Sequence, residues 1–170
     1  MTRLVALVPV GVLLVLLAMF AVYSLNRQPQ VVPTAMVGKP LPDLTLPDLK
    51  SAVPTRLRGV GGPRLVVFYA SWCGPCAEEA PTLMALQAEG VQITGIAYKD
   101  KPADARGFLA RFGNPFNQTL TDQDGAAGLE VGLTGVPETY AITARGIIAA
   151  KHALPLTPSD AEALLAAAGR

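Results

Sequence analysis

The 170-residue chain has few of the residues that usually carry metal or nucleic-acid binding. It contains two cysteines and one histidine, His152. A zinc site needs four ligands, so these three residues do not supply one. A copper site made by the two cysteines and His152 is a weaker alternative to a surface histidine at a strand end. The 14 basic and 13 acidic residues nearly cancel, leaving a net charge of +1. We therefore expect no metal site and no nucleic-acid partner.

Charge is also absent from residues 4–25, an apolar run near the N-terminus. As a helix, this run spans roughly 33 Å, close to the thickness of the apolar core of a bilayer. The competing interpretation is a cleaved signal peptide, whose apolar core is normally shorter and is followed by a small-residue cleavage site. The run favours a membrane anchor over 4–25, with a short N-terminus at 1–3 and a Pro-containing tether at 26–35.

The two cysteines lie together in the segment Trp72-Cys73-Gly74-Pro75-Cys76. An apolar run at 65–70 precedes them and a helix-favouring segment at 77–86 follows, so the pair is predicted at a helix N-terminus. Unpaired N–H groups and the helix dipole stabilise a thiolate there. We predict that Cys73 is the nucleophile and that the less exposed Cys76 resolves the mixed disulfide. A static disulfide is the alternative, but so short a loop removes little entropy from the unfolded chain.

Residues 36–170 are predicted to form one domain in which strands and helices alternate. A helical connection between the first two core strands implies a parallel pair, and a late hairpin adds antiparallel strands. This order predicts an α/β fold with a mixed central sheet flanked by helices. The predicted elements are strands at 65–69, 91–97, 119–124, 139–143 and 146–152, a short edge strand within 41–46, and helices at 77–86, 103–112, 126–131 and from Thr157 onward.

Several motifs in this order resemble those of known proteins. The Trp-Cys-Gly-Pro-Cys segment and Val136-Pro137 before the hairpin are similar to thioredoxin. Cys76 to Pro81 fits the Cys-x-x-Glu-x-Pro of membrane-anchored extracytoplasmic thioredoxins. The chain further resembles the CcmG/DsbE family of cytochrome c maturation over roughly Met36 to Leu156. The segments that carry this resemblance are Gly95 to Asp100, Phe112 to Pro115 and Gly135 to Tyr140.

The resemblance implies a thioredoxin-like thiol–disulfide reductase attached to the bacterial inner membrane by a single helix. Its N-terminus would lie in the cytoplasm and its domain in the periplasm. It would receive electrons from a membrane donor of the DsbD or CcdA type and pass them to apocytochrome c or a maturation protein that holds it. The redox-active Cys73–Cys76 disulfide would be its only redox group. A general extracytoplasmic reductase or isomerase, and a non-catalytic apocytochrome-binding module, are the alternatives.

The resemblance also assigns residues around the cysteines. Pro137 matches the cis-proline that faces the active site in thioredoxins, and it would leave the N–H and C=O of Val136 free to pair with an extended substrate. Trp72 would shield Cys73 and contact partners. Tyr98, Lys99 and Asp100 are placed only on the groove side, without a chemical role.

Two carboxyl groups, those of Glu79 and Glu138, are the acid candidates. Thioredoxin has an aspartate in the strand before its cysteines, and Val67 occupies the matching position here. Glu79 lies one helical turn after Cys76 and is expected to exchange a proton with that thiol. Glu138, which follows Pro137, is expected to assist or to line the substrate-binding side.

Overall fold

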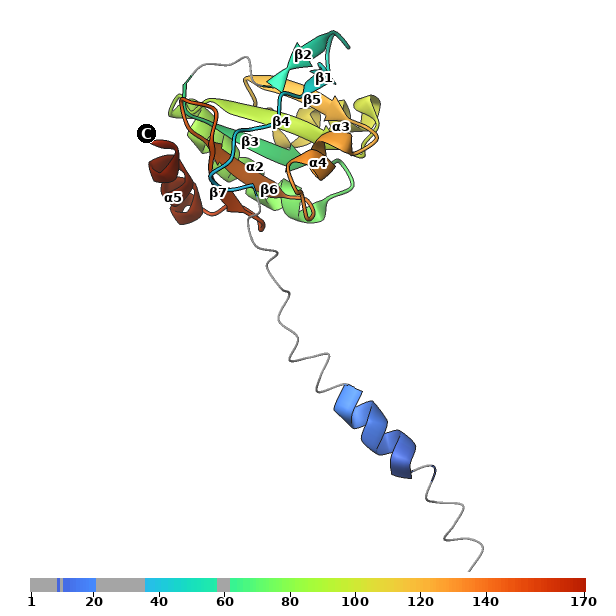
Figure 1. Ribbon diagram of the computed structural model, residues 1–170. Coiled ribbons are helices and arrows are strands. Elements are labelled where there is room, and N and C mark those ends of the chain that lie inside the picture. The colour runs from blue at the N-terminus through green and yellow to red at the C-terminus, as the bar shows by residue number, and fades with distance from the viewer. Residues whose placement is uncertain (1–8, 10, 21–35, 58–61) are drawn as a thin grey trace, which may run out of the picture. The chain divides into compact units, whose positions relative to one another are not determined.

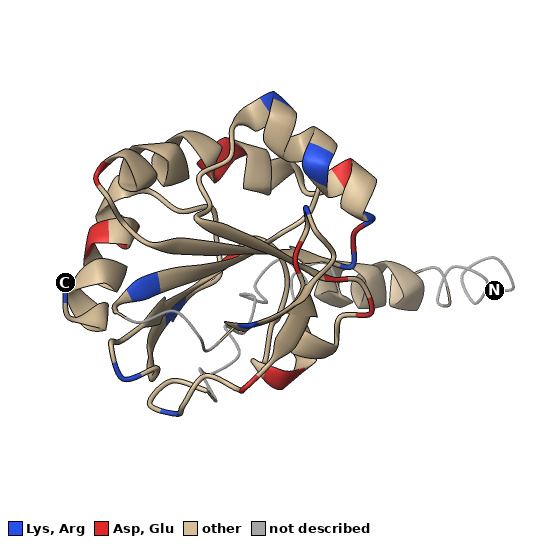
Figure 2. Ribbon diagram, turned by 90° about the horizontal axis from the view of Figure 1, so that it is seen from above, with Lys and Arg blue, Asp and Glu red and all other residues tan. Residues whose placement is uncertain are grey.

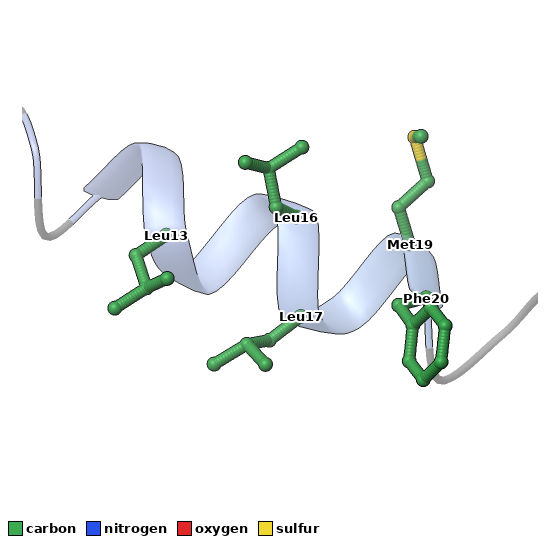
Figure 3. A pocket seen from close by; sticks show the side chains of 5 residues that line it. All are labelled: Leu13, Leu16, Leu17, Met19 and Phe20. Atoms are coloured by element: carbon green, nitrogen blue, oxygen red, sulfur yellow. The ribbon is translucent and has the colours of Figure 1, made fainter.

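The computed structural model describes residues 9, 11–20, 36–57 and 62–170. The chain divides into two compact units, Met1–Pro33 and Thr34–Arg170. In the first unit, residues 11–20 are helical and their side chains are exposed. Five of these apolar side chains line a surface pocket (Figure 3): Leu13, Leu16, Leu17, Met19 and Phe20.

The predicted anchor is only partly covered by the described residues. Within them, no helix combines the length and the apolar character needed to cross a membrane. Residues 4–8, 10 and 21–25 of the predicted anchor lie outside the described part of the chain, as do the predicted N-terminus at 1–3 and tether at 26–35.

The second unit contains eleven helices and strands within the described residues. These are β1 (Thr45–Pro47), β2 (Pro54–Arg56), β3 (Arg64–Tyr69), α2 (Gly74–Ala88), β4 (Ile93–Tyr98), α3 (Pro102–Phe112), β5 (Gln118–Asp122), α4 (Ala126–Glu130), β6 (Glu138–Ile142), β7 (Ile148–His152) and α5 (Pro158–Ala168). The principal sheet has the order β5-β4-β3-β6-β7 (Figure 1). β3 pairs in parallel with β4 and antiparallel with β6, which confirms the predicted mixed sheet.

The two faces of the sheet are covered by different parts of the chain. On one face, α2, α3 and α5 pack against alternate β3 residues such as Val67 and Tyr69. On the other, α4 and apolar residues of 36–57 pack against Val66 and Phe68. Every residue of β3 is buried, as its continuous apolar run predicted for a central strand. The cysteine segment therefore follows a strand that is buried along its whole length.

The N-terminal part of the domain differs from the predicted edge strand. Leu41 and Leu46 are buried, but strand β1 pairs with β2 in a separate two-stranded sheet. We call residues 38–49 the N-terminal strap, because they hydrogen-bond to both outer strands. The Gly38 N–H donates to the Ile148 carbonyl at 2.8 Å, and the Leu49 N–H donates to the Thr119 carbonyl at 2.8 Å. The pairing was missed because prolines interrupt the apolar pattern on which strand prediction relies.

The ends of the helices follow their local sequence. Thr157 accepts a hydrogen bond from the Asp160 N–H and Asp160 accepts one from the Thr157 N–H, so the predicted start of α5 is a capping box. Charged positions of both signs are interspersed around the domain, as Figure 2 shows. This even distribution agrees with the near-zero net charge of the sequence.

Candidate active site

Cys73 and Cys76 form a disulfide at the point where β3 leads into α2. Cys73 is the N-cap of α2, and its sulfur accepts a hydrogen bond from the Cys76 N–H at 3.1 Å. Pro75 is tolerated in the first turn because the N–H groups there have no partner within the helix. The sulfur of Cys73 therefore occupies the position in which a helix N-terminus stabilises negative charge.

Both cysteines are largely enclosed in the disulfide form. Their exposed fractions are 5% for Cys73 and 2% for Cys76, so the expected difference in exposure is small. Gly74 and Pro75 between them are exposed. The Trp72 side chain is 61% exposed, and its indole N–H donates to the Lys99 carbonyl at 3.2 Å. The pair thus lies just beneath the surface, beside a large apolar side chain that is open to a partner.

The segment before β6 contains the cis peptide bond expected from the resemblance, between Val136 and Pro137. Val136 is half-buried and contacts both apolar clusters of the core. Among the described residues, no backbone hydrogen bond to a turn or loop engages Val136. The pairing of its N–H and C=O with an extended substrate, which the resemblance implies, stays a prediction.

Glu79 projects into the interior from the same face of α2 as Cys76. The side chain is 1% exposed, and one carboxylate oxygen accepts a hydrogen bond from the Leu156 N–H at 2.9 Å. The second oxygen, Oε1, has no hydrogen-bond partner among the described residues. Burial raises the pKa of Glu79 to about 7, and the Leu156 N–H offsets part of this effect. Val67, which occupies the position of the strand aspartate of thioredoxin, packs in the same apolar cluster as the cysteines. The buried acid at this site is therefore Glu79 on the helix.

Glu138 is completely buried, and both of its oxygens have partners. One oxygen accepts hydrogen bonds from the Thr134 hydroxyl, at 2.6 Å, and from the Thr134 N–H. The other accepts the Tyr140 hydroxyl and lies 2.9 Å from the Lys151 ammonium. Lys151 also donates to the Gly132 carbonyl at 3.0 Å. This geometry favours a role in holding the loop before Pro137 over direct contact with substrate.

Sequence reasoning missed the partners of Glu138. Lys151 and Tyr140 lie directly opposite each other in neighbouring strands, β7 and β6. Which β7 residue lies opposite Tyr140 depends on the register of the hairpin, which the alternation of residues within each strand does not fix. The Nε2 atom of His152 lies 3.7 Å from the Asp160 carboxylate, Oδ2. Among the described residues, no group of three or more His, Cys, Asp or Glu side chains is placed to hold a metal ion.

The fold and the cysteine pair define a class of protein: a thioredoxin-like thiol–disulfide oxidoreductase. The Redoxin family model matches residues 36–165. The chain is 39% identical to the thiol:disulfide interchange protein DsbE of Allochromatium vinosum, covering 89% of this chain and 84% of that protein. It is 41% identical to the thiol:disulfide interchange protein HelX of Rhodobacter capsulatus, covering 78% and 76%. The chain therefore belongs to the Redoxin family and, within it, to the DsbE family of thiol:disulfide interchange proteins.

Solved structures show the same fold. A secreted Mycobacterium tuberculosis disulfide oxidoreductase homologous to Escherichia coli DsbE superposes with a TM-score of 0.65 at 23% identity, covering 74% of this chain and 96% of that one. The M. tuberculosis DsbF structure superposes with a TM-score of 0.67 at 21% identity, covering 74% and 95%. At these identities the likeness concerns the fold, and the family assignment comes from the closer relatives.

Proposed function

We propose that this protein reduces disulfides of apocytochrome c, or of a maturation protein that carries it, before haem is attached. The observation that carries the proposal is the Cys73–Cys76 disulfide at the start of α2, in a chain about two-fifths identical to DsbE and HelX proteins. Haem attachment to a Cys-x-x-Cys-His segment requires free thiols. A dithiol protein can supply them by exchange.

The reaction begins with Cys73 as the thiolate. Its sulfur attacks one sulfur of the client disulfide, the client S–S bond breaks, and a mixed disulfide forms while one client thiolate leaves. Cys76 then attacks the Cys73 sulfur, which releases the second client thiolate and forms the Cys73–Cys76 disulfide. Two electrons pass from the protein to the client, and the client thiolates take up protons. A membrane donor of the DsbD or CcdA type would restore the dithiol.

Glu79 supplies the proton acceptor for the second step. It lies one turn after Cys76, both side chains are buried, and Oε1 of Glu79 has no hydrogen-bond partner among the described residues. A carboxyl whose pKa is about 7 can take a proton from a thiol and return it at neutral pH. Exposed Trp72 and the backbone of Val136, which precedes cis-Pro137, supply the client-facing surface.

The N-terminal apolar run supports attachment to the inner membrane, with the domain in the periplasm. Residues 11–20 are helical, and their apolar side chains are exposed in the described structure. Periplasmic disulfides form and persist in an oxidising compartment, so a reductase there needs a dedicated electron supply. Anchoring at the membrane would hold the domain near such a donor.

Complementation tests the proposed client. Cells without their own copy receive the wild-type chain or a Cys73→Ser, Cys76→Ser double variant, and haem staining measures covalently loaded c-type cytochrome. We expect loaded cytochrome with the wild type only. Full assembly with the double variant, without added reductant, would show a non-catalytic binding module instead. If other exported proteins also accumulate disulfides in the variant, the protein is a general reductase.

A trapping experiment tests the chemistry directly. The reduced Cys76→Ser variant is mixed with a peptide that carries an oxidised Cys-x-x-Cys-His segment. We expect a mixed disulfide through Cys73, because the resolving thiol is missing. The matched Cys73→Ser variant should form little of it. Equal trapping by both variants would contradict the assignment of Cys73 as the nucleophile.

A further inference from the structure

Asp100 connects the end of β4 to the segment that carries the cysteines. Its side chain is 6% exposed, and both carboxylate oxygens face Ser71. Oδ2 accepts the Ser71 N–H at 2.6 Å, and Oδ1 accepts the Ser71 hydroxyl at 2.8 Å. Ser71 lies two residues before Cys73, at the turn between β3 and α2. One buried side chain thus holds both polar groups of this turn residue.

Lys99 makes a second contact to the same turn. Its carbonyl accepts the indole N–H of Trp72 at 3.2 Å. Its backbone has a positive φ of 46°, which is uncommon for a residue with a side chain. The Lys99 N–H donates to the Asp122 carbonyl at 2.8 Å, which fixes this conformation from the neighbouring strand.

Gly125 contributes from the loop after β5. A Cβ atom at Gly125 would lie 2.4 Å from Cε of Lys99, so the lysine side chain lies directly against the glycine. Gly125 itself has a positive φ of 79°, which suits glycine. The conformation of Lys99 is therefore held from two sides, by its backbone and by its side chain.

We propose that Asp100 is a positioning residue for the nucleophile, acting through Ser71, and that Lys99 orients Trp72 beside it. The Cys73 sulfur accepts the Cys76 N–H only while the turn keeps Cys73 at the N-cap of α2. Releasing Ser71 lets the turn move, so the thiolate spends less time at the helix N-terminus. The inference rests on Cys73 as the nucleophile.

The test compares two variants that remove the same charge. Asp100→Asn can keep both contacts, since its carbonyl oxygen can accept the Ser71 N–H and its amide can donate to the Ser71 hydroxyl. Asp100→Ala keeps neither. We expect the Cys73 pKa, measured from the pH dependence of alkylation, to be about half a unit higher in Asp100→Ala than in Asp100→Asn, which lowers the thiolate fraction about threefold. Asp104→Ala, which removes an exposed acid in α3, should match the wild type.

Fluorescence provides an independent reading, because Trp72 is the only tryptophan. Asp100→Ala should lower its anisotropy in the folded protein, and Asp100→Asn should restore it. If Asp100→Ala does not fold, Ser71→Ala removes one of the two contacts and should raise the Cys73 pKa by a smaller amount. Identical pKa values and anisotropies in the Ala and Asn variants would overturn the proposal. Faster alkylation of Cys76 than of Cys73 in the wild type would instead refute the nucleophile assignment.

Discussion

The backbone N–H of Leu156 donates to the Glu79 carboxylate at 2.9 Å, across 77 positions of the sequence. This bond ties the active-site helix to the segment before α5. It satisfies one oxygen of a carboxyl group that is otherwise surrounded by protein. Burial without a cationic partner among the described residues favours the protonated acid, which explains the raised pKa of Glu79.

The first prediction concerns the stability of the oxidised protein against pH. Between about 4.5 and about 7, the unfolded chain has released the Glu79 proton and the folded protein keeps it. This contribution is fully present below pH 4.5 and is lost as the pH rises through about 7. The free energy of unfolding of Glu79→Gln, measured in urea titrations, should not show this loss, which amounts to roughly 3 kcal/mol. Glu78→Gln, at an exposed position, should show the same dependence of unfolding free energy on pH as the wild type. A Glu79→Gln curve that runs parallel to the wild-type curve would contradict the assignment.

The second prediction concerns the reduced protein. An ionised Glu79 next to the buried thiol disfavours the Cys76 thiolate, because like charges repel strongly where water is excluded. Glu79→Gln should therefore lower the Cys76 pKa. Thiolate absorbance against pH, in a Cys73→Ser background that leaves a single thiol, measures it. An unchanged titration would mean that Glu79 does not act on Cys76.

The third prediction concerns the order of reaction of the two thiols. In the reduced, folded protein, Cys73 should be alkylated faster than Cys76, because its sulfur is the N-cap of α2. Mass spectrometry of briefly alkylated protein gives the site of modification. Denatured protein provides the control, in which the two thiols should react at similar rates. Faster modification of Cys76 in the folded state would reverse the proposed roles.

The fourth prediction concerns the buried pair of Lys151 and Glu138. Their side chains are 9% and 0% exposed, so Lys151→Met leaves a buried carboxylate without its cation. This change should destabilise the domain by about 3–5 kcal/mol in urea unfolding. Adding Glu138→Gln to the Lys151→Met variant should recover part of the lost stability, because the buried carboxylate charge is then removed. Lys101→Met, at an exposed lysine, is the control; an equally small effect at both lysines would show that the pair contributes little.

The fifth prediction concerns the packing of β4. A Cβ atom at Gly95 would lie 2.4 Å from the Phe116 ring, so Gly95→Ala forces the ring to move. Overpacking of this kind costs about 1–3 kcal/mol. Gly107→Ala, in α3, meets open space and should stabilise the helix by roughly 0.5–1 kcal/mol. Thermal unfolding of both variants provides the comparison, and a neutral Gly95→Ala would mean that Phe116 has room to shift.

Local patterns predicted the elements, and distant contacts completed the site. The apolar run at β3, the cysteine spacing and the Thr157 cap each depend on neighbouring residues, and each was found where the sequence indicated. The contact of Asp100 with Ser71 spans 29 positions and depends on the parallel pairing of β3 and β4. The family resemblance placed Asp100 on the groove side but gave no partner for its carboxylate.

Glu138 illustrates the same limit at the other side of the site. Its position after Pro137 indicated a place near the cysteines, and the acidic side chain suggested contact with substrate. The structure instead turns the carboxylate inward to Lys151 on β7. Only the pairing of β6 with β7 shows that a cation is available there, and that pairing depends on the register of the hairpin.

The N-terminal strap has a consequence for how copies of this domain behave beside one another. Outer strands expose unpaired backbone groups, on which a second chain can add a strand and begin to aggregate. Here Pro40 bridges to Ile147 next to β7, and Asp48 bridges to Leu120 on β5. A single passage of the chain thus occupies backbone positions at both borders of the sheet. Many identical molecules crowded on one surface would therefore have little opportunity to join sheet edge to sheet edge. Each domain would stay separate, with its cysteine pair accessible to a client.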